Sequence, residues 1–159
     1  MNFLKQFRVS INFKKLMKKF RFKIFPERSL IIKYYEGIVE NEDLYNYTRE
    51  VSQHDDFSPN YNVLNDIRNC EFLVSSNTIK DFVNIVKNDK KLYDERTIVF
   101  LKKMPDQVVF SEKLNLFKND FLISHHTCST IEKAMNHLRI DYKDKKFIEQ
   151  ILFELRNMN

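Results

Sequence analysis

Glycine is nearly absent from this chain of 159 residues, which contains only Gly37. An average protein has about 7% glycine. Phosphate-binding loops and dinucleotide fingerprints need several glycines at fixed spacing, because the backbone there approaches a phosphate closely. The sequence therefore excludes these binding motifs. We expect the single glycine where the backbone needs a positive φ or a bulge.

Cysteine is also scarce, and long apolar runs are missing. Cys70 and Cys128 are too few for the disulfide framework of a small secreted domain, and no Cys-x-x-Cys pair occurs. No apolar run approaches the roughly 18 residues that a membrane-spanning helix needs. The N-terminus lacks the uninterrupted apolar segment of a secretory signal. We therefore expect a cytoplasmic protein with reduced thiols, and a membrane-peripheral location is the alternative.

Acidic residues are absent from residues 1–26, which hold eight of the 27 basic residues. The remainder of the chain has 19 basic and 22 acidic residues, so a basic arm precedes a mildly acidic body. This distribution differs from the basic face of a nucleic-acid-binding protein, and we expect no nucleic-acid partner. Four lysines of the arm are candidates for contact with an anionic membrane surface or a partner: Lys14, Lys15, Lys18 and Lys19.

Hydrophobic periodicity predicts strands that alternate with helices from residue 20 onward. Phe20–Phe25 and Leu30–Tyr35 flank a turn at Pro26 and predict a β-hairpin. The order β-β-α-β-α-β-α-β-α predicts an α/β fold with a mixed, mainly parallel sheet of about five strands and crossover helices. After the hairpin, elements are expected at 41–51, 61–67, 75–91, 97–101, 105–117, 121–124, 129–138 and 145–158. We divide the chain into an arm at 1–18, an α/β domain at 19–142 and a C-terminal amphipathic helix at 143–159.

Several stretches within residues 20–142 point to a known fold family. The segment Asp56–Arg68 is followed by Arg96–Leu101 ahead of Pro105, then by Phe121–Thr127 and Thr130–Leu138. In these stretches and their order, the chain resembles the STAS family, named for sulfate transporters and anti-sigma-factor antagonists. It is most similar to the uncharacterised STAS-like proteins of Bacteroidetes-type bacteria. The resemblance implies a bacterial protein-interaction module with a regulatory role.

The resemblance also implies a modification site at a strand-to-helix turn. In antagonists of sigma-factor regulation this turn reads Asp-Ser-Ser-Gly, and a partner kinase phosphorylates the second serine. The matching stretch here is Val74-Ser75-Ser76-Asn77, so Ser76 is the candidate phosphoacceptor and Ser75 the second candidate. A phosphate there would be stabilised by the helix N-terminus. The alternative is that the two serines simply cap the helix.

The cluster His125, His126 and Cys128 is the densest group of metal-ligating residue types. Adjacent strand residues point to opposite faces of a sheet, so the two histidines are poorly placed to hold one ion. Structural zinc normally takes four ligands, and no further pair lies nearby in the sequence. We expect a strand end and a helix cap there.

These observations predict no catalytic residue, no cofactor and no metal site. We expect a non-enzymatic STAS-like protein-interaction module, whose partner is another protein or a second copy of the chain. The alternative is a peripheral membrane or lipid-binding protein that uses the basic arm. A third hypothesis is a small hydrolase or transferase that uses Cys128 or the histidines, which a deep pocket joining Cys128 to a histidine would favour.

Overall fold

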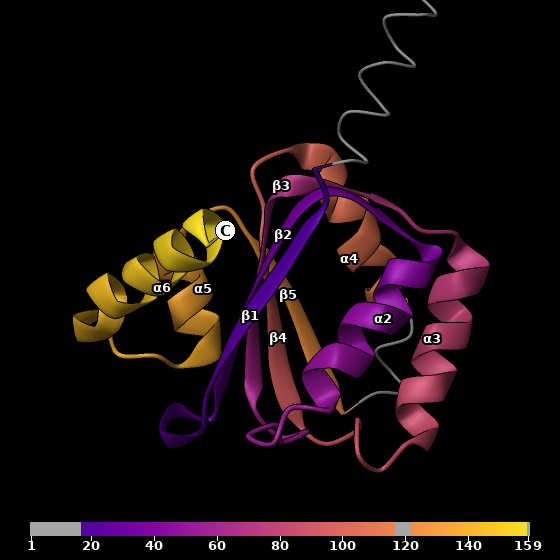
Figure 1. Cartoon of the computed structure of the whole chain (residues 1–159), viewed down its shortest axis with the longest axis horizontal. Coiled ribbons are helices and arrows are strands. Elements are labelled where there is room, and N and C mark those ends of the chain that lie inside the picture. The colour runs from indigo at the N-terminus through magenta and orange to yellow at the C-terminus, as the bar shows by residue number, and fades with distance from the viewer. Residues whose placement is uncertain (1–16, 117–121, 159) are drawn as a thin grey trace, which may run out of the picture.

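A mixed five-stranded sheet forms the centre of the computed structural model, which describes residues 17–116 and 122–158 (Figure 1). The strands lie in chain order: β1 (Lys19–Phe25), β2 (Leu30–Glu40), β3 (Asn62–Leu73), β4 (Arg96–Leu101) and β5 (Ile123–Cys128). β1 runs antiparallel to β2, and the other neighbours are parallel. The predicted fold class is confirmed.

Helices cover both faces of this sheet (Figure 1). Because each parallel strand is added on the same side of the previous one, the right-handed crossover helices all lie on one face. These are α2 (Asn41–Ser52), α3 (Ser76–Asn88) and α4 (Val108–Asn115). The opposite face is covered by α5 (Ile131–Leu138) and α6 (Lys145–Asn157). None of the described helices has the length and apolar character needed to cross a membrane.

Alternation along the strands separates two cores. On β2, Leu30, Ile32 and Tyr34 are buried against α5 and α6. Ile31 faces the other side, as do Lys33 and Tyr35. The period of two therefore places a lysine on a helix-covered face of the sheet.

The C-terminal helix belongs to the core beneath α5. Four residues of α6 are buried in the cluster that contains Leu30 and Ile32: Ile148, Ile151, Leu152 and Leu155. At the rim, Lys23 of β1 forms an ion pair with Glu154. Residues 145–157 are thus packed onto the sheet.

The local geometry agrees with the sequence-based predictions at Gly37 and Ser75, and it corrects the predicted range of the last strand. Gly37 has a φ of 85°, just after a register shift between Tyr34 and Glu36 of β2, as expected for the single glycine. Ser75 caps α3 by accepting a hydrogen bond from the Thr78 N–H. The last strand was expected at 121–124, but β5 runs from Ile123 to Cys128. Its pairing with β4 extends through the two histidines.

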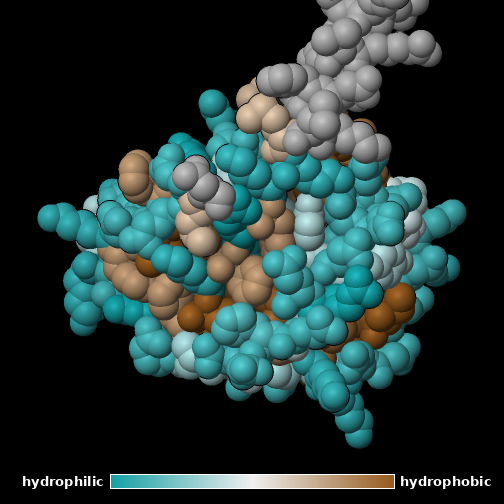
Figure 2. Space-filling model, viewed as in Figure 1, coloured by the Kyte–Doolittle hydropathy of each residue, from teal (hydrophilic) through white to brown (hydrophobic). Residues whose placement is uncertain are grey.

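The hydropathy of the surface matches a domain with its apolar residues inside. Most of the visible face is hydrophilic (Figure 2). A small apolar patch lies over α3, where Ile85 is 51% exposed.

Candidate functional site

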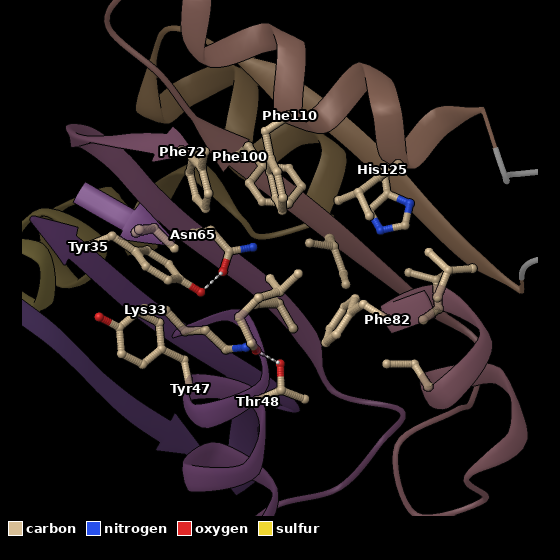
Figure 3. Close-up of a pocket in the computed structure, with 18 of the residues that line it drawn as sticks. Lys33, Tyr35, Tyr47, Thr48, Asn65, Phe72, Phe82, Phe100, Phe110 and His125 are labelled. Atoms are coloured by element: carbon tan, nitrogen blue, oxygen red, sulfur yellow. Dashed lines mark hydrogen bonds between the residues drawn. The ribbon is translucent and has the colours of Figure 1, made fainter. Parts of the chain in front are cut away.

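A cavity of about 100 Å³ lies between the sheet and helices α2, α3 and α4. We call it the central cavity (Figure 3). Its lining is mostly aliphatic and aromatic, with polar groups from the strands and from α2. The polar or ionisable lining residues are Lys33, Tyr35, Tyr47, Thr48, Asn65, Arg96 and His125. An apolar hollow with a few fixed polar groups is the usual form of a small-molecule site.

Aromatic rings build one wall of the central cavity. Phe72 and Phe110 stack with centroids 4.1 Å apart, and Phe100 meets Phe110 edge-on at 5.9 Å. Figure 3 shows the three rings together above Asn65. They come from β3, β4 and α4, so tertiary packing alone assembles this wall.

Lys33 lies in the middle of β2 and reaches into the central cavity. Burial and, to a smaller extent, the nearby charge of Arg96 lower the pKa of its ammonium to about 7. The side chain keeps part of its accessible surface, as expected for a group that lines a hollow. Among the described residues, no carboxylate forms an ion pair with it.

Arg96 begins β4 and is the second cation of the cavity. Its Nε has no hydrogen-bond partner among the described residues, and one terminal nitrogen donates to the Leu92 carbonyl over 3.4 Å. Burial lowers its pKa to about 10, opposed by the charge of Asp94. Arg96 is thus charged at neutral pH and poorly satisfied by its surroundings.

The other polar groups of the central cavity are neutral. Burial lowers the pKa of His125 to about 4, and the charge of Arg96 acts in the same direction. Tyr35 donates a hydrogen bond of 3.1 Å to Asn65 Oδ1, and burial raises the pKa of its phenol. The amide nitrogen of Asn65 points away from Tyr35 (Figure 3). Neutral donors therefore accompany the two cations.

A shallower hollow, the outer groove, runs between α2 and α3 with a volume of about 530 Å³. It shares Thr48, Phe82, Val86 and Leu92 with the lining of the central cavity. Tyr45 of α2 meets Phe82 edge-on with centroids 5.8 Å apart. One layer of side chains, with Phe82 in it, therefore separates the cavity from the groove.

The two candidate serines lie on the surface at the start of α3. Ser75 is committed to capping, because its hydroxyl bonds both the N–H and the hydroxyl of Thr78. Its own N–H donates to Asn41 Oδ1. Ser76 is the first residue of the helix and is exposed. The cap interpretation thus accounts for Ser75, and Ser76 stays a candidate phosphoacceptor.

The lysine candidates of the arm are only partly described. Lys18 Nζ lies 2.6 Å from Asp43 and 3.4 Å from Glu40, so its charge is compensated by the start of α2. Lys19 begins β1. Lys14 and Lys15 lie outside the described residues. Membrane contact by the arm stays a prediction.

The histidine–cysteine cluster is divided between the two faces of the sheet, as the strand geometry predicts. His125 lines the central cavity, whereas His126 stacks on His137 of α5 with centroids 4.1 Å apart. Cys128 is buried in the core under α5 and α6, and burial raises the pKa of its thiol. A nucleophile needs a lowered pKa, and Cys128 does not line the cavity. In the described part of the chain, no three metal-ligating side chains come together.

Sequence reasoning missed the central cavity and its two cations. Lys33 interrupts the apolar run Leu30–Tyr35, and Arg96 directly precedes the run 97–101. A charged residue inside a strand expected to be covered was the available signal. Nothing local indicated that the two side chains share one hollow.

Comparison with known proteins bears on the fold. Neither models of protein families nor curated proteins match the chain. Among solved structures, it is similar to an uncharacterised protein of the DUF3478 family with a SpoIIAA-like fold, from Shewanella loihica PV-4. The likeness has a TM-score of 0.51 at 14% identity and covers 77% of this chain and 95% of that one. It confirms the STAS-like fold expected from the sequence.

Proposed function

We propose that this chain is a non-enzymatic STAS-like binding module that takes up a small molecule in the central cavity. The observation that carries the proposal is the cavity itself. Protein interiors are packed about as densely as organic crystals, so a hollow lined by aromatic rings and fixed polar groups is exceptional. The opposite face of the same sheet is filled by side chains of α5 and α6.

The volume of the cavity limits the size of the ligand. An engineered cavity of about 150 Å³ holds benzene. The central cavity, at about 100 Å³, accepts a ligand of about one small ring after slight expansion of its walls. A long acyl chain would need α2 and α3 to separate.

The lining supports binding over catalysis. Its described residues include no carboxylate and no thiol, and the one histidine has its pKa lowered to about 4 by burial. Lys33 is the one described lining group with a pKa suited to a nucleophile or base, and no carboxylate or thiol accompanies it. We therefore assign the cations and the neutral donors to recognition of the ligand.

Cavity filling tests the proposal. Val83→Phe places a ring into the cavity from α3, and Val109→Phe is the matched control on the exposed side of α4. We expect benzyl alcohol or benzoate to raise the Tm of the wild type and of Val109→Phe, because a ligand that binds only the folded state stabilises it. Circular dichroism checks that Val83→Phe is folded, and its Tm should not respond. If neither probe binds the wild type, the proposal is wrong.

We propose in addition that the module binds a protein partner at the start of α3, in a regulatory role. Ser76 is exposed there, and the same helix walls the cavity through Phe82, Val83 and Val86. A ligand inside and a partner outside would therefore act on one helix. Pull-downs with Ser76→Asp and Ser76→Ala test this, with Ser129→Asp before α5 as the control. Partner lists that are identical in all variants would refute the phosphoswitch.

A further inference from the structure

The central cavity contains cations without a carboxylate beside them in its described lining. Elsewhere in the domain several cations make ion pairs with carboxylates, among them Lys18 with Asp43, Lys23 with Glu154, Arg28 with Asp144, Arg68 with Asp66, and Lys145 with Glu132. Lys33 and Arg96 line the central cavity and have no such pair among the described residues. An unpaired charge is most costly in a desolvated place such as the central cavity, and no carboxylate is found among the described lining residues there.

We propose that the ligand of the central cavity is a small monoanion, an aromatic or branched carboxylate of about the size of benzoate, whose carboxylate binds Lys33 in the field of Arg96 while its apolar body lies against the phenylalanine wall. This inference rests on the proposed function, because it names the ligand of the same cavity. The inference adds that the site selects a negatively charged ligand, whereas the proposed function alone would allow any molecule with one small ring.

The two cations line one cavity. Lys33 comes from β2 and Arg96 from β4, on either side of β3. Lys33 is level with Asn65 and Phe100 in the sheet. Arg96 lies four residues before Phe100 on β4, so the two cations line different parts of one hollow. A carboxylate at Lys33 would gain a charge-assisted hydrogen bond and would lie in the field of Arg96.

The remaining polar groups fit an anion better than a cation. Lys33 pairs across the strands with Asn65, whose amide nitrogen is a further donor in the lining. Arg96 Nε and the long bond to Leu92 leave the guanidinium under-satisfied. A cationic ligand would find two like charges and no carboxylate among the described lining residues. The charges of the lining therefore favour a negatively charged ligand over a positively charged one.

The apolar part of the cavity indicates that the ligand also has an apolar body. Phe72, Phe100 and Phe110 present ring faces and edges to the hollow. An inorganic anion would satisfy the cations but would leave this wall bare. Burying both parts requires a molecule with one charged end and one apolar end.

Charge-matched probes test the inference by isothermal titration calorimetry at pH 6. Benzoate, benzyl alcohol, benzylamine and sulfate differ in charge and in the ring. We expect the wild type to bind benzoate about tenfold or more tightly than benzyl alcohol, as for a charge-assisted contact against a neutral one. Sulfate and benzylamine should bind more weakly than both.

Lys33→Met is the decisive variant, because it keeps the length of the side chain and removes the charge. We expect it to lose most of the preference for benzoate over benzyl alcohol, because Arg96 is then the one cation left in the described lining. Lys87→Met, on the exposed side of α3, should retain the preference for benzoate. Equal binding of both ring probes to the wild type would overturn the charge inference and leave the proposed function intact. Absence of binding by either would defeat both, and sulfate bound as tightly as benzoate would overturn the need for an apolar body.

The pH dependence gives a second readout. The titratable groups around Lys33 are Tyr35, Tyr47, Arg96 and His125, and of these none has its pKa placed between 5 and 9. Lys33, with a pKa lowered to about 7, is the group that titrates there. Benzoate affinity should therefore fall by up to tenfold per pH unit above pH 7 and stay flat in Lys33→Met. A flat profile in the wild type contradicts the role of Lys33.

Discussion

The two faces of the sheet are built from the same strands but are packed differently. Under α5 and α6, residues such as Ile32 and Val99 pack in one buried cluster, and the buried carboxylate Asp66, two residues after Leu64 on β3, is paired with Arg68. Under α2, α3 and α4, the neighbouring residue Lys33 and the cation Arg96 enter the interior beside a hollow, without a carboxylate among the described lining residues. Under the proposed function, one face stabilises the fold and the other binds a ligand.

The largest effect is expected from removing packing on the filled face. Ile148→Ala should lower the free energy of unfolding by about 2–5 kcal/mol, because this α6 side chain is fully buried and its loss leaves a cavity. Phe153→Ala on the exposed side of α6, where the ring is 63% exposed, should cost less than about 0.5 kcal/mol. Urea denaturation of both variants measures the difference. Equal losses would mean that α6 does not contribute to the core as described.

A smaller effect of opposite sign is expected on the cavity face. Lys33→Met should raise the free energy of unfolding by about 1–3 kcal/mol, since it replaces an unpaired, desolvated ammonium by an apolar group of similar length. Denaturation without ligand at pH 6 measures this gain, and Lys87→Met serves as the surface control. A loss of stability would show that the ammonium is satisfied in the folded protein.

The pH dependence of stability sharpens the comparison further. The folded-state pKa of Lys33, about 7, lies below its ordinary value of 10.5, so the unfolded chain binds more protons between these values. Stability should therefore rise with pH from about 7 to 10.5, by at most about 1.4 kcal/mol per pH unit from this group. The difference between the wild type and Lys33→Met removes the contribution of other groups. If the two curves run parallel, Lys33 does not titrate in this range.

The smallest effect concerns the two serines before the cavity helix. Ser75→Ala should cost about 1 kcal/mol, because it removes the cap of α3, whereas Ser76→Ala should stay within about 0.5 kcal/mol. Thermal denaturation of the two variants gives the comparison. The reverse order would assign the structural role to Ser76.

Much of the fold could be predicted because its signals are local. The hairpin follows from the alternation in Phe20–Phe25 and the turn at Pro26, and the crossover helices follow from their spacing of apolar residues. The end of β5 could not be predicted from the residues 123–128 alone, since Ser124, His125 and His126 are ordinary loop residues. Pairing with the whole of β4 makes them a strand.

The candidate site was predicted less well than the fold. The serines were placed correctly at the start of a helix, and the predicted separation of His125 from His126 by the sheet is confirmed. The central cavity combines residues from four strands and three helices. The spacing of residues along the sequence does not indicate which distant residues line the same cavity.

The sequence by itself determined the alternation of strands and helices, the place of the single glycine, and the presence of a lysine within an apolar strand. These features depend on the period of side chains along a backbone, which neighbouring residues set. Tertiary structure alone decided that Lys33 and Arg96 line one hollow and that no described carboxylate joins them. The reason is physical: a cavity is the space left where distant elements fail to fill one another, and only their arrangement in three dimensions defines it.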